Sequence, residues 1–189
     1  MRENLSHTHA DAPSDWVRRC AVLLPRAAGV LDVACGRGRH VRLLAGMGHA
    51  VEAVDRDAEA LAGLSALPGV TIRVADLEKG PWPYAGRRFD GIVVSSYLHR
   101  PLFPHLVAAL ADGGVLIYET FMSGNERFGR PSNPDFLLRP NELLETFCGE
   151  LQVLAFEQGE VARPKPACVQ RLCAVRAEDP AGLRLPESV

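Results

Sequence analysis

The 189-residue sequence lacks an excess of basic residues: it has 21 Lys and Arg against 23 Asp and Glu, giving a formal net charge of −2 at pH 7. A broad nucleic-acid-binding surface usually makes a domain basic, so the composition argues against a nucleic-acid partner. No apolar run approaches the roughly 20 residues that a bilayer-spanning helix needs. The first residues, MRENLSHTHADAPSDW, contain no apolar signal-peptide core. We therefore expect a cytoplasmic protein with no membrane partner.

The sequence also has no C-x-x-C pair and no zinc-ribbon spacing among its 5 cysteines. An odd number of unpatterned cysteines favours reduced thiols over a disulfide framework, and the sequence predicts no metal site. The hydrophobic fraction of 47% and the length fit one globular domain over residues 1–189, with loose ends at 1–12 and 177–189. Usage rich in Ala and Arg suggests a bacterial source, and the oligomeric state is left open.

Short apolar runs rich in Val and Ile alternate with amphipathic stretches along the chain. Runs of this kind are typical of parallel strands covered on both faces, and the alternation predicts a doubly wound α/β fold. The last two runs are joined by GEVARPKPA, which has no helical pattern, so we expect an antiparallel hairpin there. The predicted strands span residues 30–33, 50–54, 70–74, 90–94, 115–119, 151–156 and 169–175.

Helices are expected before the first strand and between the strands. Ser14 or Asp15 is placed to cap a helix that runs to about Leu24, before Pro25. Trp16 in this segment either packs in the core or belongs to a lid. Pro140 fits an early position of another helix that ends near Phe147.

The stretch from residue 120 to 138, TFMSGNERFGRPSNPDFLL, is long for a connection and is broken by glycines and prolines. Long irregular segments in compact domains are usually functional or disordered. Phe121, Phe128 and Phe136 offer apolar anchors, so we expect a packed functional loop.

The segment VLDVACGRGRHVRLLA is typical of a strand, a glycine-rich turn and a helix, with Asp32 near the end of the strand and Gly36 and Gly38 in the turn. Small residues allow a sharp turn and close approach of a ligand, and the following helix offers free N–H groups. Asp55 follows the second strand and Asp76 follows the third. In this architecture both positions face the crevice at the carboxyl edge of the sheet, where carboxylates can bind ribose hydroxyls and an adenine amine.

At these residues the sequence resembles a known family. D-V-A-C-G-R-G is similar to the D/E-x-G/A-x-G-x-G signature of class I S-adenosylmethionine-dependent methyltransferases, and the resemblance spans roughly residues 28–120. G-R-H followed by G-H-x-V-x-A-V-D most resembles small bacterial enzymes of the tellurite-resistance methyltransferase type. The resemblance implies a Rossmann-like domain with a mostly parallel seven-stranded sheet, and S-adenosylmethionine as cofactor. The cofactor-binding residues that it implies are Asp32, Ala34, Gly36, Gly38, Asp55, Arg56, Asp76, Leu77 and Ser95.

The turn and its three acids also have interpretations that involve no cofactor. Asp32 could cap the turn, Asp55 could cap the next helix, and Asp76 could be a solvated loop acid. A dinucleotide-dependent oxidoreductase would need G-x-G-x-x-G, and Val41 stands at the third glycine position. A non-catalytic cofactor-binding module is a further alternative.

The acceptor side is expected where the fourth and fifth strands end. Tyr97, His99 and Glu119 are the candidate catalytic residues, with His99 as a general base. Each has a plain alternative: a packing aromatic, a structural histidine, or an acid that orients a neighbour. Candidate substrate-binding residues form an anion clamp, or else are solvated charges; they are Arg100, Asn125, Arg127 and Arg130, with Arg139 beside them.

Two absences narrow the chemistry. The fourth strand is not followed by an Asn/Asp-Pro-Pro-aromatic motif, which argues against adenine or glutamine N-methylation, and no G-x-S-x-G indicates a hydrolase. Little chain is left for a separate substrate domain, so we predict a small polar or anionic acceptor. The alternative is a protein or RNA component that contacts the 120–138 loop.

The first prediction separates the two enzyme classes. The purified protein is expected to bind S-adenosylmethionine and not NAD in calorimetric titrations, because Val41 removes the third glycine of the dinucleotide fingerprint. Binding of NAD alone would contradict the methyltransferase interpretation.

Overall fold

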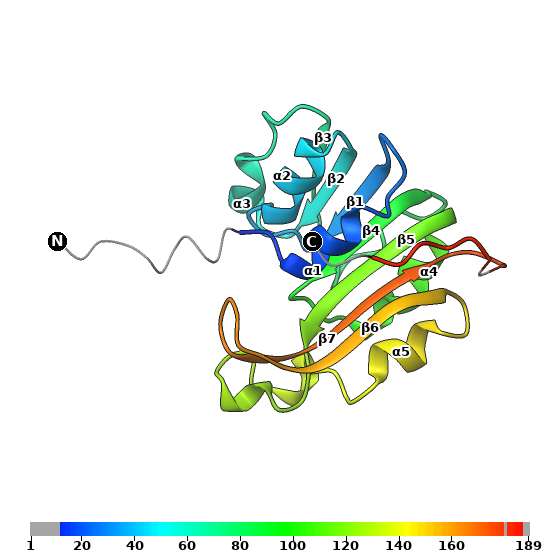
Figure 1. Cartoon of the computed structure of the whole chain (residues 1–189). Coiled ribbons are helices and arrows are strands. Elements are labelled where there is room, and N and C mark those ends of the chain that lie inside the picture. Colours follow the sequence, from blue (N-terminus) through cyan, green and yellow to red (C-terminus); the bar gives the residue numbers. More distant parts are fainter. Residues whose placement is uncertain (1–11, 180, 187–189) are drawn as a thin grey trace.

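The computed structural model describes residues 12–179 and 181–186, which form a mixed seven-stranded sheet with helices on both faces (Figure 1). The strand order is β3-β2-β1-β4-β5-β7-β6. The strands are β1 (Gly29–Val33), β2 (Ala50–Asp55), β3 (Val70–Val74), β4 (Phe89–Ser95), β5 (Leu110–Phe121), β6 (Gln152–Val161) and β7 (Ala167–Val175). The doubly wound prediction is confirmed.

The first five strands pair in parallel, and β7 is inserted antiparallel between β5 and β6. The expected terminal hairpin is therefore present. β5 begins earlier than expected, at Leu110, because Leu110 pairs with Phe89 before a register irregularity leads into the regular pairing of Gly91 with Val115. The strand ends were the least determined part of the prediction, since polar residues such as Asp112 interrupt the apolar pattern.

The helices alternate with the strands. They are α1 (Asp15–Ala21), α2 (Arg39–Gly46), α3 (Ala58–Ala62), α4 (Phe103–Ala108) and α5 (Glu142–Phe147), with the 3-10 turns η1 (Arg100–Leu102), η2 (Asn125–Arg127) and η3 (Pro134–Phe136). Among the described residues, no helix has the length and apolarity needed to cross a bilayer.

The core consists of two layers, one on each face of the sheet. Neighbouring strand residues alternate between them: Leu31, Ile92 and Leu116 pack in the layer that holds α4 and α5. The residues that precede or follow them in sequence, such as Val30, Val93 and Ile117, pack in the layer that holds α1 and α2. Full burial of each such side chain contributes about 1.5–3 kcal/mol, so this double layer holds the strand ends at one edge.

Helix α1 closes one of these layers. Ser14 is its cap, with its Oγ accepting a hydrogen bond from the Trp16 N–H at 3.1 Å, and the helix ends at Ala21 rather than near Leu24. The Trp16 side chain is 2% exposed within the core, so it packs there and is not part of a lid. Burial lowers the pKa of His40 to about 3, and its neutral Nε2 accepts the Ser14 N–H at 3.1 Å.

The segment from residue 120 to 138 is packed, but two of its three expected anchors are exposed. Phe128 and Phe136 are 39% and 51% exposed, so they are not buried anchors. Instead the Asn125 side chain donates to the Pro131 carbonyl and accepts the Cys168 N–H, and Leu138 is fully buried. A buried amide with both groups bonded holds the segment against β7.

Two end regions also differ from expectation. Pro140 lies before α5, which begins at Glu142, because Asn141 adopts a left-handed backbone conformation (φ 62°) that separates them. In the described part of the C-terminal tail, the Pro186 carbonyl accepts a hydrogen bond from Arg19 Nε at 3.1 Å, so this part docks on α1. The expectations for residues 1–11, 180 and 187–189 lie outside the described residues.

Gly114 generates a stability prediction. A Cβ at this position would lie 2.8 Å from the Ala111 carbonyl oxygen and 2.9 Å from that of Phe89, where the backbone has no room to move aside. Gly114→Ala is therefore expected to lower the free energy of unfolding by about 1–3 kcal/mol in urea denaturation. Gly149→Ala, where nothing lies within 4 Å, is the control. Equal unfolding midpoints for the two variants would contradict the packing argument.

Candidate functional site

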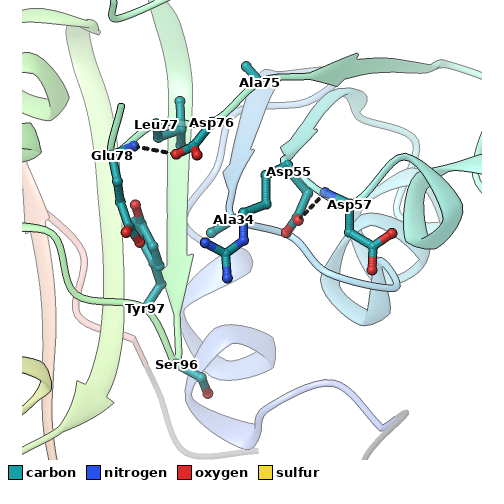
Figure 2. A pocket seen from close by; sticks show the side chains of 10 residues that line it. Ala34, Asp55, Asp57, Ala75, Asp76, Leu77, Glu78, Ser96 and Tyr97 are labelled. Carbon is teal, nitrogen blue, oxygen red and sulfur yellow. Dashed lines mark hydrogen bonds between the residues drawn. The ribbon is translucent and has the colours of Figure 1, made fainter. Parts of the chain in front are cut away.

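A cavity of about 370 Å³ opens at the carboxyl edge of the sheet, where β1, β2, β3 and β4 end (Figure 2). Because parallel strands end at the same edge, residues far apart in sequence meet there. The lining residues are Ala34, Asp55, Arg56, Asp57, Ala75, Asp76, Leu77, Glu78, Ser96 and Tyr97.

The glycine-rich turn after β1 reaches this cavity at Ala34, whereas Gly36 and Gly38 line neither cavity. Ala34, Gly36 and Gly38 all have positive φ angles, of 52°, 54° and 77°. At Gly38 an added Cβ would lie 2.5 Å from the Leu64 side chain, so a glycine lets the turn pack closely against the residues after α3. Small residues with positive φ angles allow the tight turn that places Ala34 at the cavity.

Asp55 fixes this turn to the end of β2. Its Oδ2 accepts the Gly36 N–H at 2.8 Å and its Oδ1 accepts the Asp57 N–H at 2.9 Å. Figure 2 shows the bond to Asp57 and the position of the carboxylate beside Ala34. A carboxylate has about four lone-pair sites, so both oxygens can accept further hydrogen bonds from a ligand. The helix that follows is capped by Asp57 and not by Asp55.

Asp76 and Tyr97 form the opposite wall. Asp76 Oδ1 accepts the N–H groups of Glu78 and Lys79, at 3.0 and 3.3 Å, and leaves Oδ2 available. Burial, with the nearby acids Glu78 and Asp76, raises the pKa of Tyr97 to about 12, so the phenol keeps its proton at neutral pH. Tyr97 was expected at the acceptor side, and the structure places it in this smaller cavity.

Asp32 lies below the turn and is 1% exposed, so it does not line the cavity directly. Its Oδ2 has no hydrogen-bond partner among the described residues. Burial raises the pKa of Asp32 to about 8, while the charge of Arg39 acts in the opposite direction. A buried carboxyl with an unpaired oxygen is costly unless a donor or cation joins it. This unpartnered oxygen fits a site that receives a positively charged ligand group.

A larger cavity of about 1120 Å³ adjoins the first, and Ser96 lines both. Its walls come from the N-terminus of α1, the end of β5, the segment around η2 and the turn between β6 and β7. Arg39, at the start of α2, also lines it and donates to the hydroxyls of Ser95 at 3.1 Å and Ser96 at 3.4 Å. Ser95 therefore holds Arg39, and its neighbour Ser96 borders the cavities.

Glu119 faces this larger cavity from the end of β5 and is 9% exposed. Its Oε2 accepts a hydrogen bond from Arg171 Nε at 2.6 Å, and Arg171 also pairs with Glu157 at 3.3 Å. Glu157 in turn pairs with Arg19 of α1 at 2.7 Å. The ion-pair chain holds the Glu119 carboxylate in one orientation at the cavity wall.

Several acceptor-side residues lie away from where we expected them. His99 and Arg100 line neither cavity. Arg100 instead binds the buried Glu142, with Nε 2.6 Å from Oε1. Burial raises the pKa of Glu142, but hydrogen bonds from Arg100 and the Arg139 backbone outweigh it and hold that pKa below its usual value. Arg100 and Arg139 therefore pair with a buried carboxylate of the chain and do not form an anion clamp.

The remaining clamp candidates divide into two kinds. Asn125 borders the larger cavity, but its amide is used in the hydrogen bonds that hold the segment. Arg127 and Arg130 also border it, and Arg127 pairs with Glu160 at 2.7 Å. Sequence reasoning missed Arg39, Arg171 and the basic turn between β6 and β7. A single basic residue after a glycine turn, or on a hairpin, carries no spacing signal.

The buried Asp32 predicts a pH dependence of stability. Its pKa is about 8 in the folded chain against a usual 3.8, so between these values the folded state holds a proton that the unfolded state releases. The stability that this bound proton adds to the folded state is complete below pH 3.8 and is lost as the pH rises through about 8. The unfolding free energy should therefore fall from pH 5 to pH 8 by more in the wild type than in Asp32→Asn, by up to a few kcal/mol.

Urea denaturation at several pH values measures this difference. Asp112→Asn, which changes a fully exposed carboxylate, is the control and should follow the wild type. Parallel curves for wild type and Asp32→Asn would contradict the raised pKa.

Comparisons with known proteins concern the fold of the chain and one of its segments. Residues 30–114 match the family model of a methyltransferase domain. No curated protein matches the chain in sequence. TehB from Haemophilus influenzae has a similar structure, with a TM-score of 0.68 and 20% identity over 86% of this chain. This chain spans 61% of the length of TehB.

Two further structures share the fold. N-methyltransferase NodS from Bradyrhizobium japonicum has a TM-score of 0.66 and 16% identity, covering 86% of this chain and 93% of its own. The 1,6-didemethyltoxoflavin-N1-methyltransferase of Burkholderia thailandensis, with bound 1,6-didemethyltoxoflavin and S-adenosylhomocysteine, has a TM-score of 0.61 and 21% identity, covering 87% of this chain and 79% of its own. At these identities the likeness establishes the fold. The chain therefore has the fold of S-adenosylmethionine-dependent methyltransferases, and its residues 30–114 match a methyltransferase domain.

Proposed function

We propose that the protein transfers a methyl group from S-adenosylmethionine to a small polar or anionic acceptor held in the larger cavity. The observation that carries the proposal is that two cavities meet at Ser96, at the carboxyl edge of the sheet. The smaller cavity has the donors and acceptors that an adenosine needs. The larger one has room for a second molecule, since small-molecule sites usually measure about 300–1,000 Å³.

The smaller cavity supports the following roles. Asp55 would bind the ribose hydroxyls, because each of its oxygens keeps a free lone pair beside the cavity. The Asp76 carboxylate and the Leu77 backbone would hold the adenine, with Arg56 and Tyr97 on the walls. The backbone of Ala34, Gly36 and Gly38 would pass under the methionine part.

Asp32 would complete the cofactor site. An ammonium group near its unpaired Oδ2 stabilises the ionised carboxylate and lowers a pKa that burial alone has raised. Ser95 would act from the same side by holding Arg39 at 3.1 Å.

When bound, the cofactor supplies an electrophilic methyl group on a sulfonium, so the chain's residues have to align the acceptor and exclude water. Glu119 is the residue best placed to help the acceptor. Its Oε2 is fixed by Arg171, and its Oε1 can accept the proton that an attacking hydroxyl, thiol or amine releases. His99 lies outside both cavities, so we do not assign it the base.

A labelling experiment tests the proposed function. The protein is incubated with methyl-labelled S-adenosylmethionine and a cell extract, which is then divided into small molecules, protein and RNA. We expect label in the small-molecule fraction. Label only in protein or RNA would favour the alternative in which the 120–138 segment contacts a macromolecule.

Asp55→Asn tests the cofactor role in the same assay. Loss of a charged hydrogen-bond acceptor should weaken cofactor affinity about 10- to 100-fold and reduce labelling at limiting cofactor. Glu59→Gln is the matched control, because Glu59 is exposed on the neighbouring α3 and does not line the cavity. Equal cofactor affinity in both variants would refute the assignment of Asp55.

A further inference from the structure

We propose that the acceptor is an elongated molecule with an apolar body and an anionic end, a carboxylate or a phosphate, which binds the basic rim of the larger cavity. The basic rim comprises Arg130, Arg163 and Lys165. This inference rests on the proposed function, because it assumes that the acceptor's reacting end lies near Ser96.

The register of the sheet places the rim beyond the end of β5. β5 ends where Phe121 pairs with Val169, while β6 and β7 continue to pair as far as Val161 and Ala167. The turn between β6 and β7 therefore projects beyond the carboxyl edge of β5. Figure 1 shows this orange hairpin turn beside the yellow-green segment after β5. The cavity thus has an inner end at Ser96 and an outer end at Arg163 and Lys165.

The charges at the two ends differ. At the inner end, Glu119 and Arg171 neutralise one another at 2.6 Å. Arg39 also lies there, where its charge acts on the buried Asp32 carboxyl and it donates to the Ser95 and Ser96 hydroxyls. At the outer end, Arg127 is paired with Glu160 at 2.7 Å. Arg130, Arg163 and Lys165 form no ion pair within the described residues. Exposed basic residues are ordinarily solvated, but these come from two separate segments that border one cavity.

An anion at the outer end would offset the repulsion between these cations. Arginine presents a planar set of donors that matches carboxylate and phosphate oxygens. The Asp15 carboxylate also lines the cavity, but it belongs to α1 and so to another wall. The rim therefore selects for negative charge.

The wall between the two ends is largely apolar. Phe121 and Val169 face one another in the sheet register, and Val161 and Ala167 lie next to the turn. A small inorganic anion would leave this surface in contact with water. An organic molecule with an apolar body would cover it, at about 25 cal/mol per Å² of apolar area.

Binding measurements with simple probes test the inference. Phenyl phosphate, 3-phenylpropionate and 3-phenylpropanamide are titrated calorimetrically into the wild-type protein, with and without S-adenosylhomocysteine. We expect one or both anions to bind at least about 10-fold more tightly than the uncharged amide, and to weaken as the salt concentration rises. The two anions distinguish a phosphate end from a carboxylate end.

The triple variant R130E/R163E/K165E reverses the charge of the basic rim. It should lower the affinity of the preferred anion by about 10-fold or more and leave the amide unchanged. The control R26E/R88E/R184E makes the same change in net charge at exposed positions that do not line the cavity, and should bind like the wild type.

Failure of both anions to exceed the amide, or unchanged anion binding in the rim variant, overturns the inference. An equal loss in the control variant also overturns it, because the effect would then come from net charge. Binding of S-adenosylhomocysteine is followed in the same titrations. If S-adenosylhomocysteine does not bind, the proposed cofactor roles are contradicted. If it binds but the anions do not, only the proposed role of the rim is contradicted.

Discussion

The hydrogen bond from the Gly36 N–H to the Asp55 carboxylate, at 2.8 Å, is the contact on which the site depends. It joins the turn after β1 to the end of β2, and the same carboxylate also accepts the Asp57 N–H at the entrance to α3. A charged acceptor that bonds two backbone donors fixes the turn more firmly than a neutral one would. Asp55 also lines the smaller cavity, so one side chain both fixes the turn and forms part of the cavity wall.

Burial sets the electrostatics around this contact. Asp32 lies in the core below the turn with an unpaired oxygen, and burial raises its pKa to about 8. Tyr97 and His40 shift in the directions that keep both neutral, because each is partly or largely removed from water. The two acids therefore differ in character: Asp55 is hydrogen-bonded and lines the cavity, whereas Asp32 is buried with an unpaired oxygen.

The terminal hairpin gives the molecule its second cavity. Insertion of β7 between β5 and β6 places Arg171 opposite Glu119, and the ion pairs continue through Glu157 to Arg19 on α1. These contacts join the hairpin to the helix whose N-terminus forms another wall. The walls of the cavity therefore come from segments that are distant in sequence. The exposed ion pair between Arg127 and Glu160 adds little stability to this arrangement.

The sequence by itself determined the strands, the doubly wound sheet and the positions of Asp32, Asp55 and Asp76 at its edge. Apolar runs and glycine turns are local patterns, and parallel topology converts strand ends into neighbours. The tertiary structure decided which charged side chains pair. Arg100 pairs with the buried Glu142. Tyr97 and Asp76 line the same cavity. Arg163 and Lys165 line the larger cavity because the hairpin extends beyond β5. The partner of a long charged side chain depends on which opposite charge lies nearby in the folded chain. The spacing of charged residues along the sequence does not predict this.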